Sequence, residues 1–171
     1  MLTELTDMTA TDVTLETFRD AMAQLGAAVH VITTDGPGGR AGFTASAVCS
    51  VTDTPPSVLV CINRTSSAYA AVNANGRVCI NTLSADQHDV SVGFSKKGTM
   101  DDRFAHGTWI EQNGAPPRLA DASASIDCRI VSRTSVGTHD ILICEVGEIV
   151  SNAHPGVLIY YDRKYHRVMR G

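Results

Sequence analysis

The sequence lacks the features that mark membrane, secreted and nucleic-acid-binding proteins. No apolar run approaches the roughly 20 residues that span a bilayer. The first residues, Met1 to Asp7, are acidic and polar, without the basic and apolar stretches of a secretory signal. Lysine and arginine number 14 against 18 aspartate and glutamate, and the net charge is -4. We therefore expect a cytoplasmic protein that binds neither membrane nor nucleic acid.

Metal-binding and thiol-redox motifs are also absent. There is no CxxC sequence and no Cys/His pair at metal-ligand spacing, and the 6 histidines form no ligand pattern. The 5 cysteines are far apart, and each lies in an apolar, strand-like segment. We predict no metal site and buried, reduced thiols that act as small hydrophobic side chains. These cysteines are Cys49, Cys61, Cys79, Cys128 and Cys144.

Glycine-rich nucleotide motifs give only a formal match. The segment 36–41 reads GPGGRA and fits GxGxxA after a strand, but a dinucleotide fold needs a helix to begin there. Pro37 lies in this turn, and residues 42–45 continue as a strand. We interpret the segment as a hairpin loop. Walker A, HExxH and GxSxG sequences do not occur.

Local patterns predict one helix near the amino terminus. Thr14 is a good N-cap, and Leu15, Phe18 and Met22 recur at helical spacing up to Leu25. We expect this helix to pack its apolar face on a sheet. Residues 1–13 are predicted to form a flexible arm, and residues 14–171 a single domain.

Strands dominate the rest of the chain. Short helices are expected at 67–73, ended by Asn75-Gly76, and from Ser84, where Gln87 completes a capping box. Residues 93–117 read as a long irregular loop. Most connections are too short for a helical crossover, so we predict a mainly β fold, an antiparallel sheet curled into a barrel. The expected strands are 28–34, 41–52, 57–62, 77–82, 122–131, 140–150 and 157–161.

Three segments could line a ligand site, and each has a simpler explanation. Small side chains at 41–47 let a flat ligand approach the backbone, or let two sheets or subunits pack closely. The segment 63–67 follows a strand and opens a helix, which suits a phosphate but also ordinary N-capping. His139 opens an apolar strand, at a cavity mouth or merely at a hairpin turn. The residues alone leave these alternatives open.

Taken together, the segments resemble the flavin reductase family of two-component flavin-dependent monooxygenases. The resemblance runs from about Phe18 to Tyr165, and it is closest to the reductase components of 4-hydroxyphenylacetate-type hydroxylation and of pyrimidine degradation. The stretches that carry it are 31–36 (VITTDG), 42–51 (GFTASAVCSV), Pro55-Pro56, 59–63 (LVCIN), 79–81 (CIN) and 137–142 (GTHDIL).

This resemblance implies a homodimeric split β-barrel of Greek-key topology with non-covalent FMN or FAD. The implied reaction is hydride transfer from NADH or NADPH to the flavin, an activity of EC 1.5.1.- type. Reduced flavin would pass to a separate oxygenase that acts on an aromatic or heterocyclic substrate. The alternatives are a flavin-binding module without turnover, a barrel without a ligand, and a pyridoxamine-phosphate-oxidase-like enzyme, which the sparse arginines disfavour.

The resemblance also implies roles for particular residues. Residues 44–47 would face the isoalloxazine, Asn63, Ser66 and Ser67 the ribityl phosphate, and 94–97 the phosphate side. His139 would position the nicotinamide, with Arg163 and Tyr165 on the same side, and no residue is an obligatory catalyst. The expected cofactor-binding residues are Thr44, Ala45, Ser46, Ala47, Cys61, Asn63, Ser66, Ser67, Phe94, Ser95, Lys97, His139, Arg163 and Tyr165.

Overall fold

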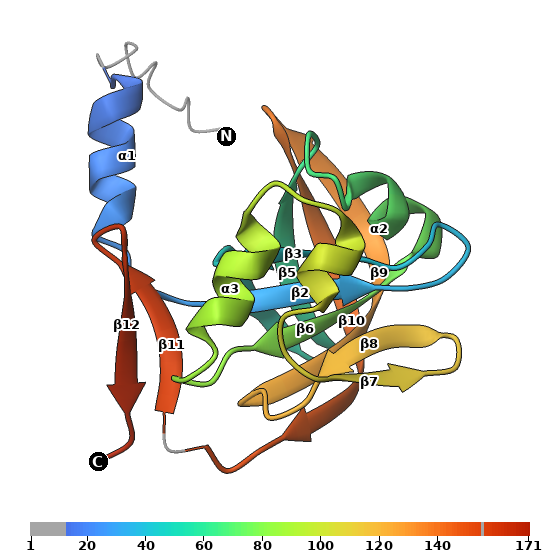
Figure 1. Ribbon diagram of the computed structural model, residues 1–171. Helices are drawn as coiled ribbons and strands as arrows, with labels where there is room; N and C mark the ends of the chain where they lie inside the picture. The colour runs from blue at the N-terminus through green and yellow to red at the C-terminus, as the bar shows by residue number, and fades with distance from the viewer. Residues whose placement is uncertain (1–12, 155) are drawn as a thin grey trace.

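The computed structural model describes residues 13–154 and 156–171, and it is mainly β with short helices, as predicted (Figure 1). The expected flexible arm lies outside these residues except for Val13, and the single domain stays a prediction. The helices are α1 (Leu15–Ala23), α2 (Tyr69–Asn75), α3 (His88–Ser95) and α4 (Met100–Phe104). The strands are β1 (Ala27–Ala28), β2 (His30–Thr34), β3 (Ala41–Ala45), β4 (Val48–Asp53), β5 (Pro56–Asn63), β6 (Arg77–Thr82), β7 (Trp109–Gln112), β8 (Ala115–Leu119), β9 (Ala124–Val136), β10 (His139–Ser151), β11 (Gly156–Tyr161) and β12 (Lys164–Met169).

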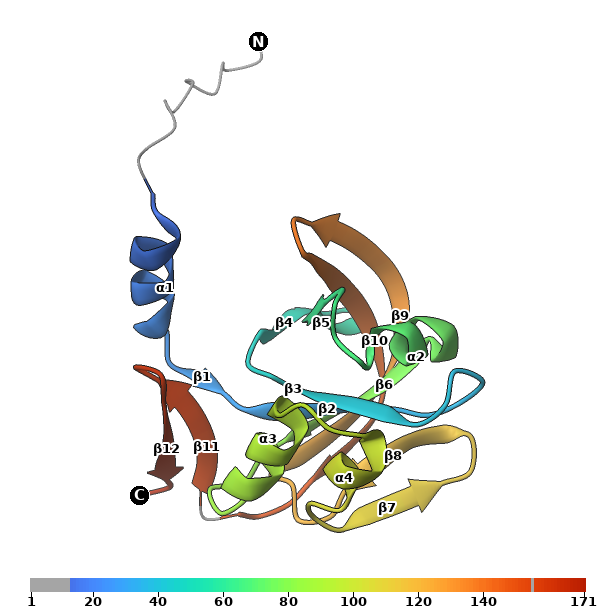
Figure 2. The same cartoon turned by 45° about the horizontal axis from the view of Figure 1, so that its top comes forward.

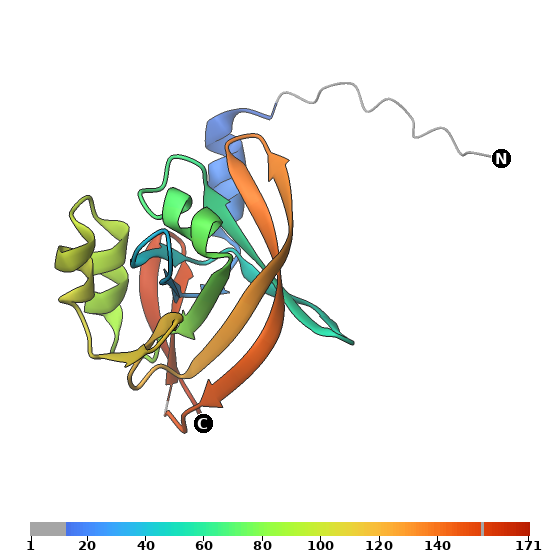
Figure 3. The ribbon, with the colours of Figure 1, turned by 90° about the vertical axis from the view of Figure 1, so that its right-hand side faces the viewer.

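A curled sheet of 7 antiparallel strands forms the body of the molecule, in the order β3-β2-β6-β9-β10-β5-β4. The strands β9 and β10, of 13 residues each, sweep along it as one long twisted ribbon (Figure 3). Strands β3 and β4 are consecutive in the chain but lie at opposite edges. Within the described residues no ladder joins these two edges, so the barrel is split rather than closed.

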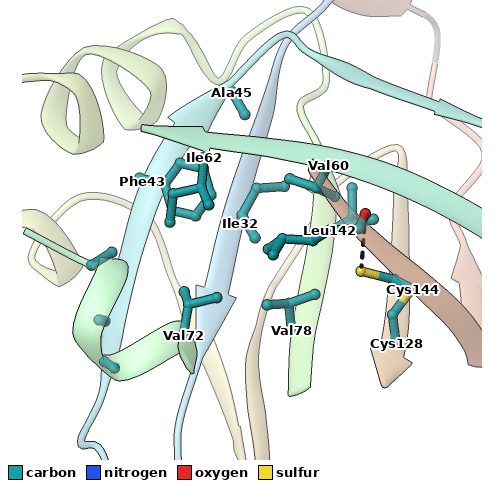
Figure 4. Packing of buried hydrophobic residues seen from close by; sticks show 14 residues of the cluster. Ile32, Phe43, Ala45, Val60, Ile62, Val72, Val78, Cys128, Leu142 and Cys144 are labelled. Atoms are coloured by element: carbon teal, nitrogen blue, oxygen red, sulfur yellow. Dashed lines mark hydrogen bonds between the residues drawn. The ribbon is translucent and has the colours of Figure 1, made fainter. Parts of the chain in front are cut away.

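The core of the sheet is built from strand residues that alternate inward. Ile32, Val60 and Leu142 have no exposed surface, and they come from β2, β5 and β10 (Figure 4). Because successive side chains on a strand point to opposite faces, each strand gives every second residue to this core. A second cluster, which includes Val31, Leu83 and Phe94, holds α3 against the sheet.

The glycine-rich loop 36–39 joins two antiparallel strands, β2 and β3, so the hairpin interpretation is confirmed. The run expected at 41–52 is not one strand, because it breaks at Ser46 and Ala47 into β3 and β4. The break is needed because the chain crosses there from one edge of the sheet to the other. Thr54-Pro55 is a cis peptide bond in the turn before β5.

The expected irregular loop at 93–117 is wrong, because it contains the end of α3, all of α4 and the hairpin β7–β8. Thr99 and Asp102 form a capping box that starts α4. The rings of Phe94, Phe104 and Trp109 then pack together with centroids 5.0–5.3 Å apart. Long-range aromatic packing of this kind has no local sequence signal.

The helix expected from Ser84 begins later, at His88. Ser84 instead makes an isolated β-bridge with Val157, although its N–H donates to Gln87 Oε1 at 2.9 Å. The hydrogen bond expected between Ser84 and Gln87 therefore forms. It lies in the connection between β6 and α3, however, and it does not start the helix. Arg77–Thr82 and the end of α2 at Gly76, which adopts a left-handed conformation, are as predicted.

Thr14 caps α1 as predicted, since its side chain accepts from Thr17 N. The helix ends at Ala23, two residues before the expected end. The expected packing on a sheet is wrong within this chain, because Leu15 is 64% and Phe18 52% exposed. The helix stands apart from the main sheet, above the hairpin β11–β12 (Figures 1 and 2).

Of the five cysteines, Cys79, Cys128 and Cys144 are buried, as predicted, but Cys61 is partly buried and Cys49 is exposed on β4. All are free thiols, and burial raises the pKa of Cys79 to about 12. The described residues hold no group of three or more His, Cys, Asp or Glu side chains placed for a metal ion. Within the same residues, no helix is both long and apolar enough to cross a bilayer.

Candidate functional site

One cavity, which we call the main cavity, has a volume of about 600 Å³. Its walls are the corner between β3 and β4, the loop after β5, the connection between α3 and α4, and the start of β10. It brings together all of the predicted cofactor-binding residues except Arg163 and Tyr165. Those that line it are Thr44, Ala45, Ser46, Ala47, Cys61, Asn63, Ser66, Ser67, Phe94, Ser95, Lys97 and His139.

The corner at Ser46 and Ala47 forms part of the wall of this cavity. Ala47 O accepts from Cys61 N at 3.0 Å, which fixes the corner to β5. In the part of the chain that is described, neither Ser46 N nor Ala47 N has a protein acceptor. Thr44 Oγ1 donates to Ser91 O at 2.7 Å, so its hydroxyl proton is already used. The corner therefore offers two amide donors and small side chains, which suit the polar edge of a flat ring.

The loop after β5 is shaped by its own side chains. Asn63 Oδ1 accepts from both the N–H and the hydroxyl of Thr65, each at 2.9 Å. Helix α2 begins at Tyr69 with Ala68 as its N-cap, and no side chain caps it. The segment 63–67 therefore supplies no N-cap residue to α2, although Ser66 Oγ accepts from Ala68 N at 3.3 Å. Thr65 also lines the main cavity, although the sequence analysis did not select it.

His139 is exposed at the start of β10, where it lies opposite Asn63 in the strand register. Its Nδ1 lies 2.9 Å from Thr138 Oγ1. The imidazole is thus held at the cavity rim, next to the loop that follows β5. This position suits a group that orients a ligand, in keeping with the cavity-mouth alternative.

The next residue, Asp140, is only 1% exposed and was not selected from the sequence. Its carboxylate accepts from the hydroxyls of Ser135 and Tyr69, each at 2.7 Å. Arg64 and Arg133 lie 3.8 and 3.9 Å away. The Ser135 and Tyr69 hydrogen bonds, followed by the two arginines, lower the pKa of Asp140.

Arg64 also donates to Gly137 O, so the loop after β5 is tied to the turn that carries His139. The buried Asp140 carboxylate is the centre of this connection, because it contacts α2, β9 and the loop together. Two walls of the main cavity are therefore held at a fixed separation by one charged group.

The opposite wall is positively charged. Lys96 and Lys97 are exposed, and Arg103 of α4 is buried at 8% exposure, and all three line the main cavity. Arg103 donates to Gly42 O and to Lys96 O, each at 3.0 Å. The sequence analysis missed Arg103, since a single arginine inside the acidic run MDDRF reads as a surface residue. Phe43 and Gly98 were missed as well.

Arg163 and Tyr165 line a second cavity of about 360 Å³ on the other side of the corner. The two cavities share Thr44, Ala45, Ser46 and Ser95. Arg163 and Tyr165 were expected on the same side of the site as His139, but they lie in the neighbouring cavity instead. Tyr165 OH accepts from Ser91 Oγ at 2.9 Å, and its ring packs edge-on against Tyr160 at 5.1 Å. Arg163 pairs with Asp20 of α1.

Comparisons with known proteins identify the family of this chain. Residues 22–169 match the family described as Flavin reductase like domain. FMN reductase (NADH) RutF of Variovorax paradoxus is 56% identical over 151 residues, which are 88% of this chain and 84% of that protein. These matches confirm the resemblance seen in the sequence.

Two solved structures support the same assignment. Flavin reductase PheA2 has a TM-score of 0.81 at 30% identity and covers 92% of this chain and 100% of its own. A homologue of nitrilotriacetate monooxygenase component B from Mycobacterium thermoresistibile has a TM-score of 0.83 at 28% identity, covering 90% of this chain and 86% of its own. The predicted split-barrel fold is confirmed.

Replacing Gly42 with alanine should disturb the wall that Phe94 forms. A Cβ on Gly42 would lie 2.6 Å from Phe94 Cε1 and 3.0 Å from Ile32 O. We expect Gly42→Ala to lower the free energy of unfolding by about 1–3 kcal/mol, measured by urea denaturation. Gly147→Ala is the control, since its Cβ meets nothing nearer than Asp127 O at 3.7 Å. Equal stability of the two variants would contradict the close packing.

Replacing Asp140 with asparagine should remove a pH-dependent part of the stability. The folded-state pKa of Asp140 is below its ordinary value, so its contribution is complete above the ordinary value and declines as the pH falls through the folded one. We expect Asp140→Asn to unfold at lower urea near neutral pH, and the difference from wild type to shrink as the pH falls below the ordinary pKa of an aspartate. A difference that does not change with pH would refute this role of the charge.

Proposed function

The chain belongs to the family of flavin reductase like domains, and we propose that it is an NADH-dependent FMN reductase. We propose further that reduced flavin leaves it for a separate oxygenase that acts on an aromatic or heterocyclic substrate. The choice of FMN and NADH is supported by the name of the 56% identical relative, FMN reductase (NADH) RutF. FAD and NADPH are the alternatives that an assay has to compare.

The observation that carries this proposal is a pair of main-chain donors without protein acceptors, Ser46 N and Ala47 N, on two residues that line a cavity large enough for a flavin ring. Cations on the far wall suit a phosphate, so the residues present fit FMN. When both cofactors are bound, the flavin accepts a hydride from the nicotinamide. The corner amides would stabilise the negative charge that develops on the ring.

The second cavity would take part of the dinucleotide. It touches the main cavity along residues 44–46, so a ligand placed there reaches the same stretch of backbone from the other side. The ring of Tyr165 offers a stacking surface, and the Arg163 side chain suits a phosphate. His139 would orient the nicotinamide from the rim of the main cavity. These roles need no proton transfer by a protein side chain.

Transfer of reduced flavin to a second protein suits the way the site is built. The flavin ring would contact main-chain donors and small residues such as Ala45, Ser46 and Ala47. These residues offer few side-chain contacts that would slow the dissociation of the flavin. One structural relative, component B of a monooxygenase, is by its name part of a multi-component system. A bound flavin that turns over without leaving would count against release.

The assay that tests the function follows NADH oxidation at 340 nm under air, with FMN, FAD or no flavin, and repeats it with NADPH. We expect FMN-dependent oxidation well above the rate without protein, and slower oxidation with FAD or NADPH. A folded protein that quenches flavin fluorescence but oxidises neither nucleotide would be a binding module. A protein that neither binds nor reduces either flavin would exclude both the flavin reductase and the flavin-binding module.

We also propose a homodimer, in which a second copy covers the apolar face of α1. Leu15, Phe18 and Met22 lie along one side of that helix and are 43–64% exposed. Val131 and Val136 of β9 are also exposed, at 44% and 57%. Leaving so much apolar surface in water is unfavourable, so association should stabilise the chain.

Light scattering after size exclusion should give twice the mass of the chain. Phe18→Asp should shift the protein toward the monomer, because a carboxylate would be placed inside the apolar contact. Glu16→Gln, a change at an exposed polar position of the same helix, is the control and should leave the mass unchanged. A monomeric wild-type protein would contradict the dimer but not the reductase.

A further inference from the structure

Arg103 is a buried cation without a carboxylate partner. The residue is only 8% exposed, and its two Nη atoms donate to the carbonyl oxygens of Gly42 and Lys96. Its Nε is buried and has no acceptor within the described residues. No ion pair of Arg103 is found there either.

Within the described residues, neither Asp101 nor Asp102, the acidic residues closest in sequence, forms an ion pair with Arg103. Asp102 accepts from the N–H and hydroxyl of Thr99, at 3.0 and 2.7 Å, as part of the helix cap. Glu111 pairs with Arg40. An arginine cannot lose its proton in a protein, so it cannot escape burial by becoming neutral. A buried charge without a counter-ion is strongly unfavourable, and something has to balance it.

The guanidinium lies in the wall of the main cavity, next to Lys96 and Lys97. The residues that line this cavity include no aspartate and no glutamate, although they include these three cations and His139. A role in tying the α3–α4 connection to β3 accounts for two donors of Arg103. It does not account for a full charge placed at the wall of a cavity that holds no negative side chain.

We propose that Arg103 is balanced by a phosphate of the bound ligand, and that it makes the main cavity select phosphorylated ligands. The inference rests on the proposed function and adds a binding residue to it. Two sources carry the same chemistry, the 5′-phosphate of the flavin and the pyrophosphate of the nicotinamide dinucleotide. The position of Arg103 in the wall of the main cavity is compatible with either.

The test compares ligands with and without phosphate. FMN and riboflavin share the ring and the ribityl chain, so the ratio of their dissociation constants isolates the phosphate. We expect Arg103→Met to weaken FMN by about 10- to 100-fold and to leave riboflavin nearly unchanged, as measured by quenching of flavin fluorescence. Arg103→Lys should keep most of the selectivity, because it keeps the charge.

Arg40→Met is the matched control. The Arg40 guanidinium stacks on Phe104 of α4 at 4.1 Å but does not line the main cavity. This variant should leave the FMN to riboflavin ratio unchanged. For the dinucleotide, the comparison is NAD⁺ with nicotinamide riboside, which lacks the pyrophosphate and the adenosine, and the readout is the change of that ratio on Arg103→Met. Loss of selectivity in the flavin pair assigns the phosphate to the flavin, and loss in the nicotinamide pair assigns it to the dinucleotide.

Unchanged ratios in both pairs would overturn the proposal, and so would equal weakening of FMN and riboflavin, since that marks a purely structural role. If Arg103→Met does not fold, wild-type protein decides, because inorganic phosphate should compete with the phosphorylated member of one pair, FMN or NAD⁺, and not with riboflavin or nicotinamide riboside. Phosphate that competes with neither FMN nor NAD⁺, or that competes equally with riboflavin and nicotinamide riboside, contradicts the proposal. Wild-type protein that binds neither flavin is a failure of the proposed function, and the nicotinamide pair then still tests Arg103.

Discussion

The structure depends on one crossing of the chain, at Ser46 and Ala47. Strands β3 and β4 are neighbours in the sequence and opposite edges of the sheet, so the two residues between them bridge the open side of the split barrel. A corner cannot continue a ladder, which leaves main-chain donors without strand partners. These donors and the small side chains around them make the surface on which both cavities meet.

Two buried charges then hold the walls around this corner. Asp140 ties the loop after β5 and the turn before β10 together, and two arginines and two hydroxyls balance its charge. Arg103 ties the α3–α4 connection to β3 through Gly42 O and Lys96 O, and no carboxylate balances it. The buried charge of Asp140 is therefore balanced within the protein, whereas the buried charge of Arg103 is balanced only when an anion is bound.

Much of the fold could be predicted because its signals are local. Thr14, Gly76 and the glycine-rich loop 36–39 act on the backbone next to them, and the breaks at Pro55-Pro56 and Asn75-Gly76 were enough to place the starts of β5 and β6. The missed elements depend on distant contacts. The short helix α4 and the hairpin β7–β8 are held by aromatic rings that meet only after folding, and the expected sheet contact of α1 does not form in this chain.

The candidate site divides in the same way. Resemblance to a family located most of the residues lining the main cavity, because they lie in short stretches on consecutive elements. It did not separate Arg163 and Tyr165 into a cavity of their own, and it did not find Arg103 or Asp140, whose importance comes from burial. Burial of a charge is a property of the tertiary structure, and an acidic run such as MDDRF gives no hint of it. The polar residues that sequence patterns miss are thus the ones whose charges position the walls, and a search of this fold for ligand determinants should start from its buried charges.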